Sequence, residues 1–465
     1  MRLLVLIFFL LNLNFSFSQK VREEIMLIVD SISSSNSIND IDYIETDFKF
    51  NDLKSFIELK NKATFNELIE LSNADNKLIR YFSLIALVDL KYEKLDYLFK
   101  KTLDNDLSFS VKNGCIVSNE SLSFVLYDRV LNQMYYNELS SKDSLFFVNK
   151  VKDFNRIILS KDKYYMLLYL ALDNNNVDLQ NYSKIRKLAI RDQNQDAILE
   201  LAKYKNKNDI QAFINLEEKA FTAISVFNDK KFWEFLVSYK NKNKSENYFN
   251  AIASFQNEES KNLLVDIINK KENDTVLSKV FKSSSRFYTP LYLDIFKEIF
   301  QKKGYLNIKI AEKLIEYNEK EASEIFSKKL LSDDLINIFF DYSTTTEIFD
   351  IYPLIISTLY KNNYKDLESI CIKRIKILDS FYMQAFLDIA EKEKFKKTSA
   401  IIIEKLKNKN TAYNYFHLSK TIFSFENKKD IETVIDLLKE NEKDWNWGNW
   451  PESFNELFKA YNLNL

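Results

Sequence analysis

The sequence predicts an all-α protein, and its composition gives the first reason. The 465 residues include only three glycines and three prolines, about a tenth of the glycine expected from average usage. Strand-connecting turns and phosphate-binding loops depend on positive-φ positions that glycine supplies easily. Helices can be joined by short turns of Asn, Asp and Lys, because Asn tolerates the left-handed conformation. The other two reasons are apolar residues at helical spacing along most of the chain and a recurring segment.

The recurring segment lies between residues 185 and 270 and consists of an apolar helix, an aromatic residue, a polar turn and a second apolar helix. Its aromatic positions are Tyr204, Phe227 and Phe255, and a further copy contains Phe425. Helix pairs that recur in this way are typical of α-solenoids, in which each pair buries its apolar face against its neighbours. A non-repetitive helical bundle is the alternative, but it would not require the shared order of aromatic, turn and helix.

Two segments are similar to HEAT repeats. Residues 75–87 combine an acidic turn with the step Ile79-Arg80 and then small and aliphatic residues, and residues 185–189 repeat the aliphatic-Arg step with Arg186. The resemblance is loose and covers about half of the chain. It implies a right-handed α-α superhelix, with each arginine near the start of the second helix of a pair and in contact with the preceding turn. It implies nothing about activity.

Residues 1–18 have the pattern of a secretory signal peptide. Arg2 precedes an almost wholly apolar run from Leu3 to Leu13, and small and polar residues follow, with cleavage expected after Ser18. The alternative is a membrane anchor, but the apolar run is short for a bilayer span of about 20 residues. We therefore expect an exported protein, either periplasmic or extracellular.

The mature chain is divided on the basis of these patterns. Residues 19–60 are expected to form a helical lead-in, residues 61–282 a first set of HEAT-like repeats, residues 283–441 a second helical half, and residues 442–465 a Trp-rich C-terminal cap. The serine-rich segment Ser283–Arg286 is the expected joint between the halves. A further helix is expected over residues 335–342, whereas residues 41–50 fit neither helix nor strand clearly.

One interruption of the helical pattern is expected near residues 107–117. Alternating residues flank Asn113-Gly114, and Asn-Gly between such runs is a strong signal for a β-hairpin. The alternative is an irregular loop. Local helix signals are also present: Thr64 and Glu67 have the spacing of a capping box, Ser121 precedes a helix, and Pro290 and Gly304 bracket another.

Charge and cysteine content limit the class of partner. Lys and Arg number 66 against 67 Asp and Glu, so no basic excess indicates nucleic acid or an anionic membrane as partner. The two cysteines, Cys115 and Cys371, lie far apart in the sequence. Burial as small apolar residues is the expected fate, and pairing is left open.

No catalytic constellation is evident in the sequence. The single histidine, His417, lies in an apolar helical context, so a packed or surface role is favoured over a triad. One histidine and two distant cysteines do not suggest zinc, and the Asp173–Asp178 run lacks the glycine and glutamate of a calcium loop. We expect no cofactor, no metal and no enzymatic activity.

The C-terminal tail contains Trp445, Trp447 and Trp450. They are expected either to cap the last repeat or to form a sticky surface for a protein or a glycan. Together these features predict a non-enzymatic exported helical-repeat scaffold that binds another protein, the partner being unidentified. The alternative is a helical-toroid carbohydrate-active enzyme or glycan-binding module with a deep pocket lined by carboxylates and aromatics.

Overall fold

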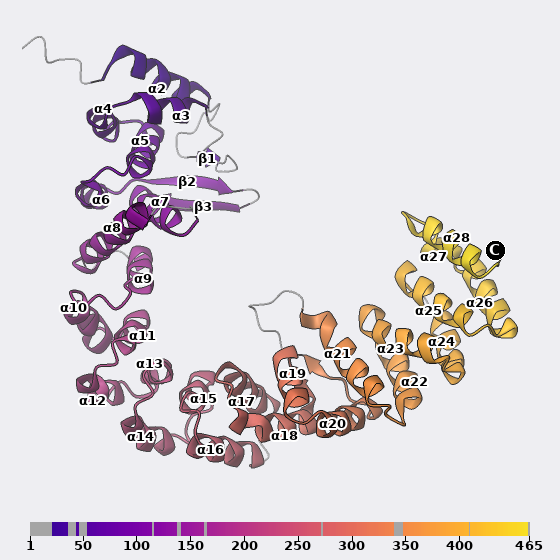
Figure 1. Ribbon diagram of the computed structural model, residues 1–465. Coiled ribbons are helices and arrows are strands. Elements are labelled where there is room, and N and C mark those ends of the chain that lie inside the picture. The colour runs from indigo at the N-terminus through magenta and orange to yellow at the C-terminus, as the bar shows by residue number, and fades with distance from the viewer. Residues whose placement is uncertain are drawn as a thin grey trace, which may run out of the picture. The chain divides into compact units, whose positions relative to one another are not determined.

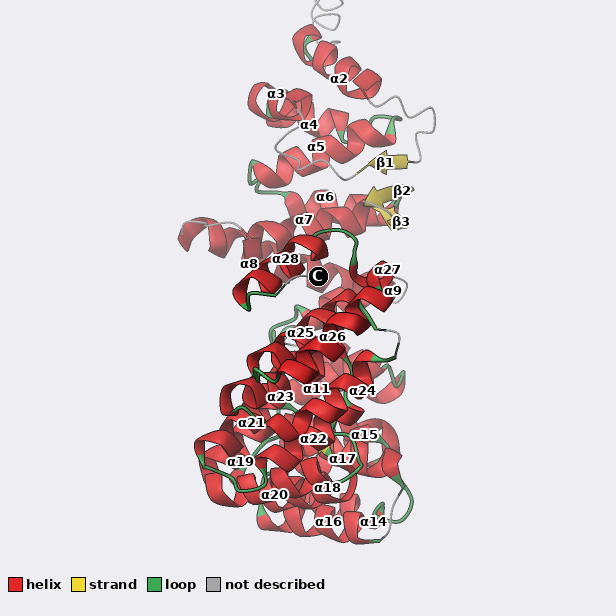
Figure 2. Ribbon diagram, turned by 90° about the vertical axis from the view of Figure 1, so that its right-hand side faces the viewer, coloured by secondary structure: helices red, strands yellow, loops and turns green. Residues whose placement is uncertain are grey.

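The computed structural model describes residues 21–35, 43–45, 54–113, 116–136, 141–161, 165–270, 273–338, 347–408 and 410–463. Within these residues the predicted all-α class is confirmed, with strands only in short segments (Figure 2). The expected signal peptide, residues 1–18, lies outside them. The chain divides into two compact units, residues 1–223 and 224–465, and the boundary falls within α13 (Phe221–Val226).

The first unit is built from helices that alternate between two layers (Figure 1). In the odd-numbered layer α3 packs on α5, α5 on α7, and α9 on α11, while α6 and α8 pack together in the even-numbered layer. Its helices are α2 (Glu23–Ser35), α3 (Lys54–Lys62), α4 (Phe65–Leu71), α5 (Lys77–Asp89), α6 (Leu95–Asp104), α7 (Leu122–Tyr136), α8 (Ser141–Leu159), α9 (Tyr165–Asp173), α10 (Tyr182–Arg186), α11 (Gln195–Lys203) and α12 (Ile210–Ile214).

The second unit repeats the two-layer alternation. In its odd-numbered layer α15 packs on α17, α19 on α21, α21 on α23 and α23 on α25, and each even-numbered helix from α16 to α24 contacts the next. Its helices are α14 (Trp233–Ser238), α15 (Glu246–Ala253), α16 (Glu258–Asn269), α17 (Asp274–Arg286), α18 (Leu293–Lys303), α19 (Ile308–Tyr317), α20 (Glu319–Leu331), α21 (Glu347–Lys361), α22 (Leu367–Ile377), α23 (Ser380–Glu393), α24 (Ser399–Leu406), α25 (Ala412–Ser424), α26 (Lys428–Glu440), α27 (Glu442–Trp445) and α28 (Trp450–Ala460).

The recurring aromatic segments share a turn geometry. After Tyr204, Phe255 and Phe425 comes one residue with φ between 49° and 58°, and then an asparagine whose side chain accepts a hydrogen bond from a backbone N–H of the next helix: Lys205-Asn206, Gln256-Asn257 and Glu426-Asn427. In these turns the asparagine is thus not the left-handed residue that the sequence suggested. Helix capping by its side-chain oxygen satisfies an otherwise unpaired donor, and a long polar side chain occupies the left-handed position instead.

The predicted hairpin is confirmed. Strands β2 (Ser108–Asn113) and β3 (Ile116–Ser121) are antiparallel, with Asn113 opposite Ile116, and the turn residues Gly114 and Cys115 lie outside the described part. A third strand, β1 (Tyr43–Glu45), pairs in parallel with β2. It lies in the residues whose pattern was ambiguous, so part of the lead-in expected to be helical is a strand.

The helix expected over residues 335–342 is wrong at its start, because Asn337 and Ile338 form β5, which pairs in parallel with β4 (Tyr305–Leu306). Gly304, at φ +70°, ends α18, and its carbonyl accepts a 2.8 Å hydrogen bond from the Asn337 N–H. The buried Arg374 guanidinium donates to the carbonyls of Lys329, Leu330, Ser332 and Asp334. These tertiary contacts fix residues 332–338 as a connection after α20.

The serine segment that was expected to join two halves is the last turn of α17. Ser283, Ser284 and Ser285 are buried, and the Ser285 hydroxyl accepts a 2.9 Å hydrogen bond from the Asn307 amide. Serines can be small packing residues as well as linker residues, and here they allow α17 to continue. The boundary between the compact units lies at residues 223 and 224 instead.

The local helix signals are confirmed where the structure describes them. Thr64 and Glu67 form a reciprocal capping box, Ser121 accepts a hydrogen bond from the Phe124 N–H, Pro290 is in a first helical turn, and Gly304 is a left-handed cap. No helix in the described ranges is long and apolar enough to cross a membrane.

Candidate functional site: an aromatic surface around His417

The three C-terminal tryptophans occupy different environments. Trp445 is buried, with its Nε1 donating to the Leu438 carbonyl at 2.9 Å and its ring 4.3 Å from that of Phe454. Trp447 is 59% exposed, and its Nε1 donates to the Asp444 carbonyl. Trp450 is half-buried against α25. Trp445 therefore has the geometry of a packing residue at the end of the unit, whereas Trp447 and Trp450 present ring surface to solvent.

Trp450 belongs to a larger cluster, here called the C-terminal aromatic surface, formed by Phe381, Tyr413, Phe416, His417 and Trp450. The ring of Tyr413 lies 4.6 Å from Phe381, 4.2 Å from His417 and 6.3 Å from Trp450, and Phe416 lies 5.8 Å from Trp450. Phe381 is 56% exposed, and the other four are half-buried. The cluster therefore presents a continuous set of ring faces and edges.

Helical spacing brings these residues together. Tyr413, Phe416 and His417 are three and four residues apart on α25, which places them on one side of the helix. The N-cap Thr411 fixes the start of α25 by accepting a hydrogen bond from the Asn414 N–H. Helix α23 packs beside α25 and supplies Phe381, while α28, which also contacts α25, supplies Trp450 (Figure 1).

The environment of His417 disfavours its charged form. Burial is the main cause of its lowered pKa, the positive charge of Lys420 lowers it further, and the carboxylate of Asp388 opposes them. Its Nδ1 is buried and has no hydrogen-bond partner. The described residues do not pair the ring with a nucleophile and an orienting carboxylate as a triad requires. The lowered pKa makes His417 a neutral ring of the surface.

Asp388 carries the carboxylate whose charge acts on both Tyr413 and His417 of this surface. It is exposed, it accepts a 2.7 Å hydrogen bond from the Gln384 amide, and its charge contributes, after burial, to a raised pKa of Tyr413. The neighbouring Glu391 differs, because the ammonium of Lys420 lies 3.3 Å from its carboxylate. Asp388 thus places an exposed carboxylate charge where it acts on the aromatic surface.

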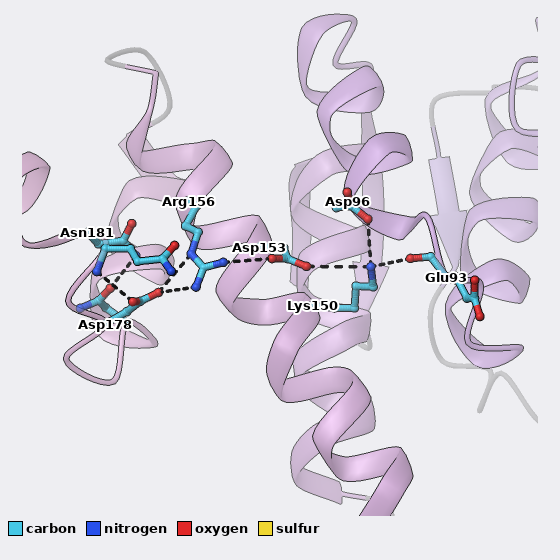
Figure 3. Close-up of polar contacts among 9 residues, drawn as sticks. Glu93, Asp96, Lys150, Asp153, Arg156, Asp178 and Asn181 are labelled. Atoms are coloured by element: carbon cyan, nitrogen blue, oxygen red, sulfur yellow. Dashed lines mark hydrogen bonds and ion pairs between the residues drawn. The ribbon is translucent and has the colours of Figure 1, made fainter.

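The first unit contains a line of polar contacts instead (Figure 3). The Lys150 ammonium on α8 lies 2.9 Å from Asp96 of α6 and 3.9 Å from Asp153, and Arg156 contacts both Asp153 and Asp178, at 3.3 and 3.0 Å. The contacts with Asp96 and Asp178 join α8 to its neighbours, whereas the two contacts of Asp153 lie within α8. This line accounts for Asp178 of the oxygen-rich run at residues 173–178, whose Asn175 donates to Glu200 and Tyr204.

The two arginines of the HEAT-like steps make different contacts. Arg80 donates to the carbonyls of Ala74 and Asn73 in the turn before α5, as the resemblance implies. Arg186 donates instead to Asp209, in the turn after α11. Both arginines therefore connect a helix to a turn, but only Arg80 contacts the turn that precedes its own helix.

Two cavities are further candidate sites. One, of about 340 Å³, lies between the turn after α4 and the end of α6, and its lining includes Arg80 and Lys101. The other, of about 450 Å³, is lined by Tyr305, Tyr352 and Tyr382 with aliphatic residues near β5. Among the described residues that line them, neither cavity has a carboxylate.

The other side chains that could take part in catalysis or metal binding do not form a cluster among the described residues. Cys371 is a free thiol, and burial raises its pKa to about 12, which leaves it protonated and unreactive. No group of three or more His, Cys, Asp or Glu side chains within the described ranges is arranged to hold a metal ion.

Three tryptophans of the tail were predicted from the sequence as a cap or a binding surface, whereas His417 was expected to have only a packed or surface role. Phe381, Tyr413 and Asp388 were missed, and the signal that could have found them is the common helical spacing of 381, 384 and 388 on one helix and 413, 416 and 417 on another. No family model matches the chain, and no curated protein is significantly similar to it. The surface must therefore be interpreted from its own chemistry.

Proposed function

We propose that this protein is a non-enzymatic exported scaffold of HEAT-like helical repeats that binds another protein through the C-terminal aromatic surface. The observation that carries the proposal is the set of five adjacent rings, from Phe381 to Trp450, on three helices of the second unit. Large, rigid rings that contribute contact area at little entropic cost dominate protein interfaces.

The two-layer alternation supports the scaffold part of the proposal. Within each layer, a helix contacts the helix two positions further along the chain, as α21 contacts α23 and α22 contacts α24. Each helix pair therefore buries apolar surface against its neighbours. We take the arrangement to continue as a right-handed superhelix, as in the HEAT-like proteins that the sequence resembles. Export is supported by the pattern of residues 1–18.

The glycan-directed alternative receives less support. A helical-toroid hydrolase needs two carboxylates flanking a sugar-binding cleft. The aromatic surface offers Asp388, but the neighbouring Glu391 is paired with Lys420. A glycan-binding role without catalysis is chemically compatible with exposed rings. It predicts that a neutral oligosaccharide binds this surface.

Site-specific photo-crosslinking in the cell of origin tests the proposal. A benzoyl-phenylalanine replaces Phe381 in the full chain, and in the matched control it replaces Tyr97, an aromatic of similar exposure at 62% on α6. We expect one protein to crosslink from position 381 and not from position 97. The identified protein, once purified, should bind the mature chain, and Phe381→Ser should weaken this binding about tenfold, whereas Tyr97→Ser should not.

The proposal fails if position 381 gives no specific crosslink, or if both positions give the same products. Export is tested separately by mass spectrometry of the protein from the cell envelope. A mature N-terminus at Gln19 is expected, and an intact Met1 in a cytoplasmic fraction would refute export.

A further inference from the structure

The C-terminal aromatic surface has a local charge as well as an apolar character. Gln384 links Asp388 to Tyr413: its amide N–H donates to the Asp388 carboxylate at 2.7 Å, and its amide oxygen accepts a 3.5 Å hydrogen bond from the Tyr413 hydroxyl. The charge of Asp388 also acts on the pKa of Tyr413 and of His417. Lys420 also acts on His417, and its ammonium lies 3.3 Å from the carboxylate of Glu391, which offsets part of its charge. Asp388 supplies a negative charge beside electron-rich ring faces.

Ring faces and a carboxylate together favour a cation. The negative face of an aromatic ring attracts an ammonium or guanidinium group within about 6 Å of its centre. The same fold shows this arrangement one helix away, where the Lys392 ammonium lies 4.3 Å from the centre of the Tyr360 ring and the Tyr360 hydroxyl donates to Glu393. Neither Tyr413 nor Trp450 has a lysine or arginine over its ring among the residues that the structure describes.

We propose that the surface formed by Phe381, Tyr413, His417 and Trp450 with Asp388 receives an arginine or lysine side chain of the protein partner. The planar guanidinium suits the site best, because it can stack on a ring while donating two hydrogen bonds to a carboxylate. Gln384, which donates to Asp388 at 2.7 Å, holds that carboxylate in place and leaves its other oxygen for the incoming donor. This inference rests on the proposed function, since it specifies the chemistry of the partner at the same surface.

The geometry also explains why a neutral histidine belongs in the cluster. A charged imidazolium beside Tyr413 would repel an incoming cation, whereas the neutral ring adds a further π face 4.2 Å from Tyr413. Lys420, on the same helix as His417, is paired with Glu391 on α23, which offsets part of its repulsion of an incoming cation.

The test uses two isosteric probes, N-acetyl-arginine methylamide and its neutral citrulline analogue. The mature chain is labelled with 5-fluorotryptophan, and the Trp450 resonance is assigned by comparison with Trp450→Phe. We expect the arginine probe to shift the Trp450 resonance in a saturable way, with Trp233 and the buried Trp445 as internal references. The citrulline probe should leave Trp450 unchanged at the same concentration.

Charge variants complete the test. Asp388→Asn should weaken binding of the arginine probe roughly three- to tenfold, and Tyr413→Leu should abolish the shift. The matched control is Asp436→Asn, which removes an exposed carboxylate from α26 in the even-numbered layer and should change nothing. Equal shifts with arginine and citrulline, or equal effects of the two Asn variants, would overturn the inference.

The two proposals can fail separately. If a protein crosslinks from position 381 but the arginine probe leaves Trp450 unchanged, the scaffold function stands and the partner uses other chemistry. If the arginine probe binds but no protein crosslinks, the surface is a cation site and the scaffold function fails. A neutral oligosaccharide that shifts Trp450 when the arginine probe does not would assign the surface to glycans and refute the cation inference.

Discussion

Asp209 accepts hydrogen bonds from Arg186 and Tyr182 at once, with 2.7 Å from the Arg186 Nε to one carboxylate oxygen and 2.6 Å from the Tyr182 hydroxyl to the other. The carboxylate is 1% exposed, although the guanidinium is 44% exposed. Burial, then the hydrogen bond to Asp209 and its charge, raise the pKa of Tyr182, which keeps its hydroxyl a donor. This contact ties α10 to the turn after α11 within the first unit.

The first prediction concerns this contact. Asp209→Asn removes the charge that both donors require, and we expect it to destabilise the first unit by about 1–3 kcal/mol. The loss should lie toward the lower end, because the half-exposed Arg186 can be solvated. The measurement is urea unfolding followed by circular dichroism. Asp192→Asn is the control, since the adjacent Arg191–Asp192 pair is on the surface and should contribute little to stability. Equal losses in both variants would contradict the role given to Asp209.

The second prediction compares two glycines with the same backbone conformation. Gly304 has φ +70° and Gly448 has φ +60°, but a Cβ at Gly304 would lie 2.8 Å from the Leu335 carbonyl oxygen, whereas nothing lies within 4 Å of one at Gly448. Gly448→Ala should therefore cost only the conformational penalty, about 1 kcal/mol. Gly304→Ala should cost at least 1 kcal/mol more, because the contact between β4 and β5 must also shift. Equal denaturation midpoints for the two variants would show that the close approach is unimportant.

The sequence was most informative about local structure. Glycine scarcity and helical spacing predicted the fold class, and Asn113-Gly114 predicted a hairpin whose strands are present. The aromatic recurrence at Tyr204, Phe255 and Phe425 marked a shared turn. What the sequence could not give depends on distant contacts. The identity of β5 is set by hydrogen bonds to Gly304 and by Arg374, more than thirty residues away from it in either direction.

In the candidate site, too, the sequence predicted local features but not those that depend on distant contacts. Tryptophan content drew attention to residues 445–450, but sequence could not separate the buried Trp445 from the exposed Trp447. That difference depends on the ring of Phe454 of α28, which packs on Trp445, and on the carbonyl of Leu438, which accepts a hydrogen bond from the indole. The role of Asp388 follows from the pairing of Lys420 with Glu391, and a single sequence does not reveal which carboxylate a lysine selects.

The third prediction concerns acid stability near the N-terminus. The Arg22 guanidinium hydrogen-bonds to Glu67, and despite burial this contact, with further hydrogen bonds from Thr64, lowers the pKa of Glu67 to about 2. A lowered pKa in the folded state stabilises the protein above pH 4.5, the ordinary value for this group. The contribution is then lost as the pH falls toward 2.

Glu67→Gln should therefore lower stability at pH 7 by about 2 kcal/mol, a figure reduced for the half-exposed Arg22. It should also flatten the dependence of the urea midpoint on pH between 5 and 2. Glu23→Gln, which changes an exposed carboxylate in the first turn of α2, should retain the wild-type pH dependence. If the two variants have the same pH profile, the Arg22–Glu67 contact does not govern acid stability.

The last prediction concerns a strained valine. Val177 has φ +57° and follows Asn176, which also has a positive φ, in the turn between α9 and α10. A β-branched residue is disfavoured in this conformation because its Cβ substituents crowd the backbone. The side chain is 38% exposed, so it contributes little to the core. Val177→Asn should therefore stabilise the first unit by about 1 kcal/mol, because asparagine tolerates the left-handed region. The control Val237→Asn changes a similarly exposed valine within α14 and should be neutral or slightly destabilising. Thermal unfolding measures both, and a loss of stability in Val177→Asn would mean that the valine side chain makes contacts worth more than the backbone strain it imposes.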